Sequence, residues 1–335
     1  MVVSVQTILS LVQRRIDASK AHAQAGRKLI SKGLGLSTFR LLQWRHIVWN
    51  DLRLASALLE CPTLPFSPRN ASAKLPPSLI DQAHLLTLAT EQLIPTSSRL
   101  STKAAYDLFL GLHQIGLALG MPLVEEKHLL AIENVYYGNV YQLCLMTAEI
   151  RTIDLRSFSA SDSLVLSAAS FIWACTPSFV SLKGVFPSVM DILQSQLLRQ
   201  LYERLVHEVD LMGSWQKQAR LESLLWVLSV GTIAANTISS GDNPWMPQPV
   251  HPWFVKKLRE IAVELHVRSV DDLERALRLF PWADPFSSED CRMMWARLAL
   301  SNVEDAPAFN VSGTSESVIS VPCDISYGTM IPSVL

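Results

Sequence analysis

The chain has 335 residues, of which 49% are hydrophobic and only 18% are charged, and its formal net charge is −1. This length suits one large domain or two ordinary ones, and the composition excludes a chain that is disordered throughout. The five cysteines are scattered, with the closest two 31 residues apart. This spacing excludes a clustered metal site made by this chain alone and favours reduced thiols in an intracellular compartment.

The most apolar stretches are too short or too interrupted to cross a bilayer, which takes roughly 20 apolar residues. Leu224–Ala235 stops after 12 residues at Asn236, and serines, a threonine and a proline interrupt 164–182. We therefore predict two buried core helices and no membrane contact. The N-terminus does not resemble a secretory signal either, because Arg14 and Arg15 follow its short apolar stretch without a small-residue cleavage pattern.

The N-terminal part of the chain is basic. Residues 1–53 carry nine Lys or Arg side chains and two Asp side chains. We predict that residues 1–36 form a basic N-terminal segment, made of a solvated helix face and a turn around Gly33 and Gly35. Such a segment could carry an import signal or touch DNA, and we expect at most weak DNA binding from it.

Helical periodicity dominates the rest of the chain up to about residue 302. Ser37 is expected to cap a helix that ends at the proline-rich break 61–77. Further helices are predicted at 78–94, 101–119, 125–151, 161–175, 187–210 and 216–238. The last of these is apolar nearly all round, which marks the centre of the core.

Three shorter helices are predicted to close the ordered part. Pro252 is expected to open a helix over 252–266, and Ser269 to cap the next one. Asp271 and Asp272 are favourably placed at the positive end of that helix. The third should begin at Ser287. The predicted fold class is thus all-α, a single large helical array over 37–301, followed by a loosely ordered tail over 302–335.

Two short acidic motifs suggest a comparison with terpene cyclases, which are all-α enzymes of similar length. Asp271-Asp272 begins like their aspartate-rich motif, but Arg275 stands in place of the third carboxylate. Asn50-Asp51 begins like their second motif, but leucines replace its hydroxyl and carboxylate ligands. A site that lacks half of its oxygen ligands cannot hold Mg²⁺ and a diphosphate, so we reject this interpretation.

Other catalytic patterns are missing as well. The sequence has no phosphate-binding loop, no Gly-x-Ser-x-Gly motif, and no two histidines three or four residues apart. His207 and His251 are interpreted as surface or capping residues. We therefore predict no enzymatic activity, no catalytic, cofactor-binding or metal-binding residues, and no cofactor.

Most tryptophans lie at helical spacing beside leucines and phenylalanines, a pattern typical of core packing rather than of a platform for nucleic-acid bases. Trp226 and Trp253 in particular are expected to be buried.

Two segments combine these tryptophans with other residues in a recognisable order. The first is a tryptophan-rich helix with an Asp-x-Arg motif and a proline-leucine-proline stretch: Trp44, Trp49, Asp51, Arg53, Ala55, Ala57, Pro62, Leu64 and Pro65. The second is a hydrophobic helix, a Trp-Phe pair, a capped helix, a Phe-x-Trp motif and a final Trp helix: Trp226, Trp253, Phe254, Ser269, Phe280, Trp282 and Trp295. Together they resemble the regulatory domain of fungal zinc-binuclear-cluster transcription factors over about 37–300, and the second segment is the more specific.

This resemblance implies an all-α regulatory domain of the middle homology type in a nuclear transcription regulator. Such a domain would act through a protein partner, a homodimer or a small-molecule effector. The family's DNA reader needs six closely spaced cysteines, which this chain lacks. We therefore expect a stand-alone domain or one whose upstream zinc cluster is missing from the gene model. The alternative is an all-helical interaction module unrelated to transcription.

Overall fold

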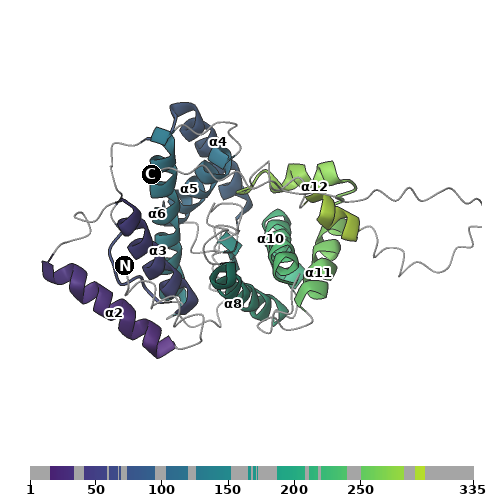
Figure 1. Cartoon of the computed structure of the whole chain (residues 1–335). Coiled ribbons are helices and arrows are strands. Elements are labelled where there is room, and N and C mark those ends of the chain that lie inside the picture. The colour runs from purple at the N-terminus through teal and green to yellow at the C-terminus, as the bar shows by residue number, and fades with distance from the viewer. Residues whose placement is uncertain are drawn as a thin grey trace, which may run out of the picture.

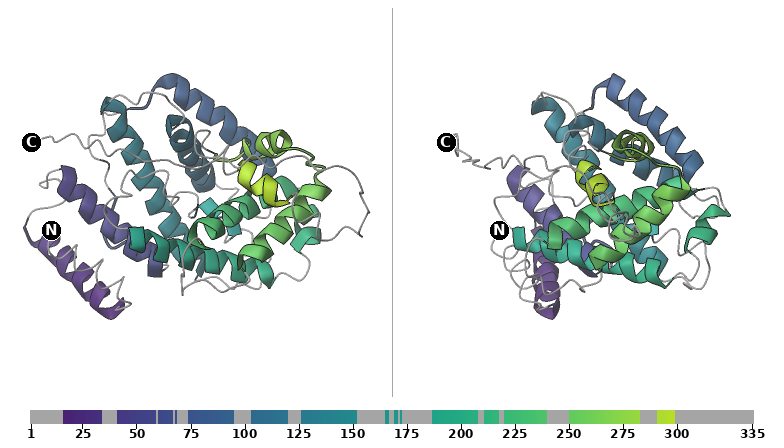
Figure 2. Two further views of the ribbon diagram at one scale, coloured as in Figure 1. Left: turned by 45° about the vertical axis from the view of Figure 1, so that its right-hand side comes forward. Right: turned by 90° about the vertical axis from the view of Figure 1, so that its right-hand side faces the viewer.

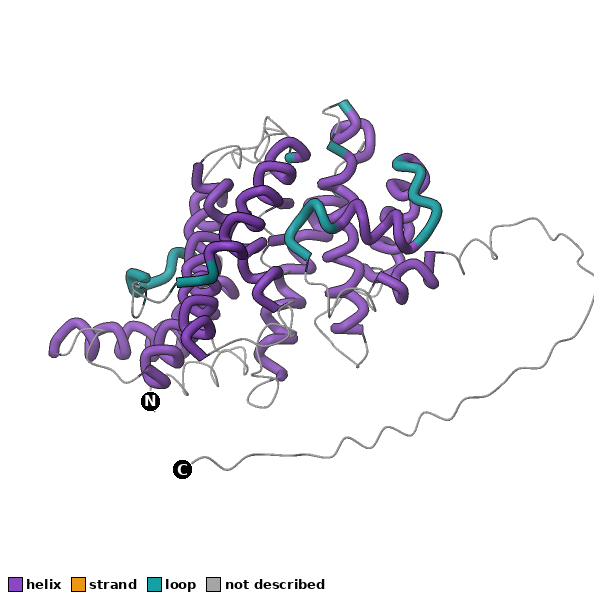
Figure 3. Tube along the Cα trace, turned by 90° about the horizontal axis from the view of Figure 1, so that it is seen from above, coloured by secondary structure: helices purple, strands orange, loops and turns teal. Residues whose placement is uncertain are grey.

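The structure, a computed structural model of the whole chain, is an assembly of α-helices (Figure 1). It describes residues 16–33, 41–58, 60–66, 68, 74–94, 103–119, 126–151, 187–207, 211–217, 220–239, 250–282 and 291–298, with five residues between 165 and 172. These residues include no β-strand, which confirms the predicted all-α class, and Figure 3 shows only helices and loops among them. No helix in these ranges is both long and apolar enough to cross a bilayer.

The N-terminal helices pack as a series of neighbours. They are α2 (Ile16–Gly33), α3 (Leu41–Leu58), α4 (Pro77–Leu93), α5 (Lys103–Leu119) and α6 (Glu126–Arg151). α4 lies against α5, α5 against α6, and α6 against α3. α2 runs along the outer edge beside α3, at the left of Figure 1.

The C-terminal helices surround α10. They are α8 (Pro187–Val206), α9 (Leu211–Gln216), α10 (Leu221–Ser239), α11 (Val250–Glu264), α12 (Val270–Leu277) and a last helix at 291–298. α10 contacts α8, α9, α11 and α12, and α8 also contacts α3. A single core cluster therefore runs through both groups of helices.

The burial of α10 confirms its predicted place at the centre of the core. Between Leu221 and Ala235, only Glu222 and Ile233 are not fully buried. Gly231 allows α11 to approach, since a Cβ added there would lie 2.3 Å from Cε1 of Phe254. A stripe of buried residues on α5 likewise follows the predicted spacing: Ala105, Leu108, Phe109, Leu112 and Ile115.

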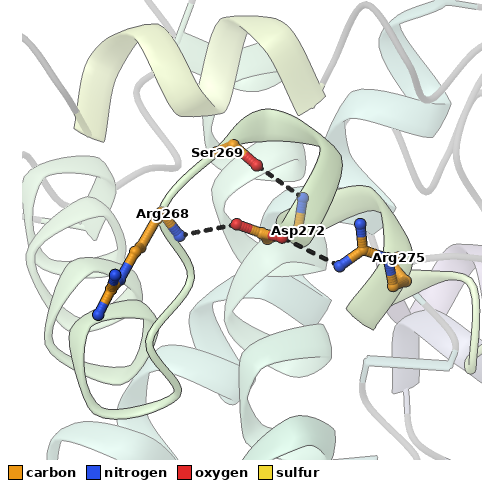
Figure 4. Close-up of polar contacts among 4 residues, drawn as sticks. All are labelled: Arg268, Ser269, Asp272 and Arg275. Carbon is orange, nitrogen blue, oxygen red and sulfur yellow. Dashed lines mark hydrogen bonds and ion pairs between the residues drawn. The ribbon is translucent and has the colours of Figure 1, made fainter.

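The ends of α11 and α12 follow known capping chemistry. The Asp272 N–H donates to the Ser269 hydroxyl at 3.1 Å, which confirms the predicted cap, and the Asp272 carboxylate accepts from the Arg268 N–H at 3.2 Å (Figure 4). Hydrogen bonding of the Asp272 carboxyl group to the Ser269 side chain, and then to the Arg268 N–H, lowers the pKa of Asp272. α11 ends in a Schellman motif with His266 at φ 55°, where the Val267 N–H donates to the Ala262 carbonyl.

Several predicted boundaries are wrong. A short helix, α9, forms where a link between two long helices was expected, and α11 begins at Val250 rather than at Pro252.

The predicted burial of Trp253 is wrong. Trp253 is only partly buried, because it packs on the rim of the core beside Tyr202. The predicted helix over 161–175 is described only at 165–166, 169–170 and 172, where the residues are helical and buried.

Some predicted features lie outside the described residues. They are the Ser37 cap, the glycine turn after residue 33, the Ser287 cap and the tail over 302–335. The basic N-terminal segment is described over 16–33, where it forms α2. None of the described side chains of this helix is buried, as expected of a solvated helix.

Candidate functional site

A small pocket lies between α2, the second half of α3 and the segment that follows α3. Its volume is about 70 Å³, and it is lined by Lys20, Ala23, Gln24, Asp51, Leu54, Ala55, Glu60, Cys61 and Thr63. Pockets for drug-sized molecules measure roughly 300 to 1,000 Å³. As it stands, the pocket therefore accommodates a side chain or a few non-hydrogen atoms.

Asp51 forms the inner wall of the pocket and holds the following segment in place. Its carboxylate accepts hydrogen bonds from the Leu64 N–H at 2.9 Å and the Thr63 N–H at 3.2 Å, and a third from the Thr63 hydroxyl. Burial raises the pKa of Asp51, while these hydrogen bonds and the positive charge of Arg27 act in the opposite direction. The acidic member of the Asp-x-Arg motif is thus a structural residue that fixes the segment 60–66 on α3.

The outer wall of the pocket is held less firmly. Lys20 on α2 pairs with Glu60 at 2.7 Å, and both side chains are well exposed. Exposed ion pairs contribute at most about 1 kcal/mol. Cys61 lies exposed among the lining residues. The described side chains of α2 are exposed or half-buried, so on this side the pocket is closed by a helix at the surface of the protein.

The second resembling segment forms a compact aromatic cluster in the core. Trp226 of α10 is fully buried, and its ring stacks on Phe280 with centroids 5.6 Å apart and an interplanar angle of 16°. Its indole N–H donates to the Pro281 carbonyl at 3.2 Å. Phe109 of α5, one of the N-terminal helices, also contacts this indole, with ring centroids 6.1 Å apart. The Phe-Pro-Trp motif therefore closes the core over α10.

A buried polar link joins the two helix groups. The Thr90 hydroxyl of α4 donates to the Leu279 carbonyl after α12, and His113 Nε2 of α5 lies 2.8 Å from the same hydroxyl. A hydroxyl has one proton to donate, so it accepts from His113, whose Nε2 carries the proton. Burial lowers the pKa of His113 to about 3. Sequence spacing gave no signal of this link, since it joins residues distant along the chain.

Two histidines singled out in the sequence, His207 and His251, lie outside the buried polar link. His207 is exposed, as interpreted from the sequence. His251 was interpreted as a surface or capping residue, but it is half-buried and its Nε2 contacts the Arg297 guanidinium of the last helix. Burial, and then the charge of Arg297, lower the pKa of His251. Arg259 donates to the Leu298 carbonyl at 3.2 Å, so α11 holds the last helix at two points.

The described residues include no group of three or more His, Cys, Asp or Glu side chains placed to hold a metal ion. Asp272, part of the motif compared with a magnesium site, lies in the first turn of α12, where its carboxylate accepts from the Arg268 N–H.

Comparisons of the chain with protein-family models, with well-characterised proteins and with solved structures find no match.

Proposed function

We propose that this chain is a nuclear transcription-regulatory domain of the fungal zinc-cluster type, which acts through contacts with a protein partner or a small-molecule effector. One observation carries this proposal. The two segments that resemble the family contribute to one continuous core although they are far apart in the sequence. Trp44 and Trp49 belong to this core from the first segment, and Trp226, Phe254 and Phe280 from the second. Residues that define the fold of a family are expected to lie in its core, so the burial of these aromatic residues supports the resemblance.

The pocket beside α2 supports the regulatory part of the proposal. Asp51 is a fixed inner wall, whereas on the α2 side Lys20 forms an exposed ion pair with Glu60. A ligand larger than a side chain would fit here only if α2 moved outward, because the pocket measures about 70 Å³. A binding event is thus converted into a change at the surface of the domain, which is how a regulatory domain acts.

The proposal assigns no DNA-reading role to these 335 residues. The closest two cysteines are 31 residues apart, whereas a binuclear zinc cluster needs six closely spaced cysteines. Arg27 and Lys28 are exposed on α2 and can contact phosphates. We expect weak, sequence-independent DNA binding that weakens tenfold or more between about 50 and 200 mM salt. A sequence-specific complex that survives this change in salt would contradict the assignment.

The location of a fluorescently tagged full chain in a fungal cell tests the proposal in another way. We expect accumulation in the nucleus, because a transcription-regulatory domain acts there. A Trp226→Ala variant, which should be strongly destabilised, shows how the tagged protein behaves when its fold is weakened. Exclusion of the folded protein from the nucleus would contradict the proposal and favour an interaction module unrelated to transcription.

A further inference from the structure

The pocket between α2 and α3 combines apolar side chains with one buried carboxylate. Ala23 of α2 lines it together with Leu54 and Ala55 of α3, both of which are buried. Asp51 adds a carboxyl group whose residue is only 8% exposed. The left view of Figure 2 shows α2 on the outside of the molecule, so the pocket lies close to the surface. A ligand that enters the pocket therefore has to cover apolar side chains and satisfy a carboxylate.

The Asp51 carboxylate has room for one more hydrogen bond. Each carboxylate oxygen carries two lone pairs. Oδ1 accepts from the Thr63 N–H and the Thr63 hydroxyl, whereas among the described residues Oδ2 accepts only from the Leu64 N–H. Burial raises the pKa of Asp51 in spite of these bonds and of the charge of Arg27, so its surroundings do not fully replace the lost hydration. A cationic donor in the pocket would supply what is missing.

The other charged groups of the lining offset each other. Lys20 and Glu60 form an ion pair at 2.7 Å, which leaves Asp51 as the remaining charge of the lining. An anionic ligand would be repelled by this carboxylate. A neutral apolar ligand would cover the carboxylate without offering it a donor, and covering a charge in this way is costly. The lining therefore favours a small cation with an apolar part.

We propose that this pocket binds a primary ammonium group carried by a short aliphatic chain. The ammonium group donates a hydrogen bond to Asp51 Oδ2, and the chain packs on Ala23, Leu54 and Ala55. The volume of about 70 Å³ limits the ligand to a few non-hydrogen atoms, as in propylammonium. The regulatory role of such binding rests on the function proposed above, which it deepens by naming the chemical class of the effector.

The small size of the ligand predicts weak binding. A molecule of about four non-hydrogen atoms makes few contacts, and its hydrogen bond to Asp51 is its main directed interaction. We expect a dissociation constant on the order of 10⁻³ M for propylammonium.

Cys61 provides a direct readout of the occupied pocket. It lines the pocket and is exposed, whereas Cys144 and Cys291 are buried. The alkylation of Cys61 by iodoacetamide is followed on the full chain by peptide mass spectrometry. Propylammonium at about 10 mM should slow this reaction about tenfold, because about nine in ten pockets are then filled. Propan-1-ol and propanoate are similar in size but lack the positive charge, so at equal ionic strength they should leave the rate unchanged.

Equal slowing by propan-1-ol would overturn the proposal, since binding would then need no charge. An unchanged rate with propylammonium at about 100 mM, far above the expected dissociation constant, would overturn it as well.

Two substitutions on α2 test the location of the ligand. Ala23→Leu places a larger side chain in the pocket and should abolish the slowing by propylammonium. Ala25→Leu is the matched control, because Ala25 is exposed on the same helix and does not line the pocket. Asp51→Asn removes the charge but keeps one oxygen as an acceptor, and it should weaken binding at least tenfold. Equal slowing in the Ala23→Leu and Ala25→Leu variants would overturn the proposed site.

A free amine and the lysine side chain of a partner protein carry the same ammonium group. Nα-acetyl-lysine methylamide, which presents that side chain on a short backbone, distinguishes these two sources. Slowing by this compound as well as by propylammonium indicates a partner lysine, and slowing by propylammonium alone indicates a free amine. Alkylation of Cys61 is measured without transcription. Failure of this test would therefore remove the ammonium ligand, whereas failure of the proposed regulatory function would appear in the location of the chain in the cell.

Discussion

Replacing Trp226 by alanine should remove a large share of the stability of the protein. The indole is fully buried, stacks on Phe280 and donates a hydrogen bond to the Pro281 carbonyl. Truncation of a buried tryptophan costs roughly 3 to 5 kcal/mol. The Pro281 carbonyl also loses its donor, so we expect the upper end of that range, about 5 kcal/mol. A loss of that size approaches the whole stability of a marginal domain.

Two further substitutions separate the contributions to this loss. Trp226→Phe keeps an aromatic ring but removes the indole N–H, and it should cost about 1 to 2 kcal/mol. Trp253→Ala truncates a tryptophan that is only partly buried, and it should also cost about 1 to 2 kcal/mol. The free energy of unfolding is measured by urea denaturation with linear extrapolation. Equal losses for Trp226→Ala and Trp253→Ala would refute the assignment of Trp226 to the centre of the core.

Three further predictions test separate parts of the structure. In the wild type, His113 takes up a proton below pH 6.5 when the chain is unfolded, but only near pH 3 when it is folded. The free energy of unfolding should therefore fall by about 2 kcal/mol between pH 6.5 and about pH 5. His113→Gln, which keeps a donor at Nε2, should remove this loss, and an unchanged pH dependence of urea denaturation would contradict the link. Asp51→Ala leaves donors in the segment 60–66 without an acceptor, so limited proteolysis should cleave there faster, and unchanged cleavage would argue against this role. Gly231→Ala should destabilise by about 1 to 3 kcal/mol because its Cβ would lie 2.3 Å from an aromatic carbon, whereas Gly138→Ala, at 3.2 Å, should be nearly neutral in thermal melting.

Local signals in the sequence predicted the helices well. The spacing of apolar residues identified α5, α10 and α12, because one face of each helix meets the core. The cap at Ser269 was also predictable, since its hydrogen bond reaches only three residues along the chain. The short helix α9 was missed because six residues are too few to establish a periodic pattern.

Long-range contacts could not be predicted in the same way. The hydrogen bond from Thr90 to the Leu279 carbonyl joins residues 189 positions apart, and no local pattern encodes it. The orientation of α4 was hidden for a related reason. Its sequence offers leucines and threonines to either face, and its contact with α5 decides which face is buried. The pocket likewise depends on the docking of α2 beside Asp51, which composition alone does not reveal.

The most direct measurement for the proposed function is transcription from a reporter gene to which the chain is tethered. The full chain is fused to an unrelated DNA-binding domain that recognises the reporter promoter, and both are expressed in a fungal cell. We predict that transcription rises or falls relative to the DNA-binding domain alone, and that Trp226→Ala removes this change. A folded, nuclear fusion protein that leaves transcription at the level of the DNA-binding domain alone would contradict the proposed regulatory function.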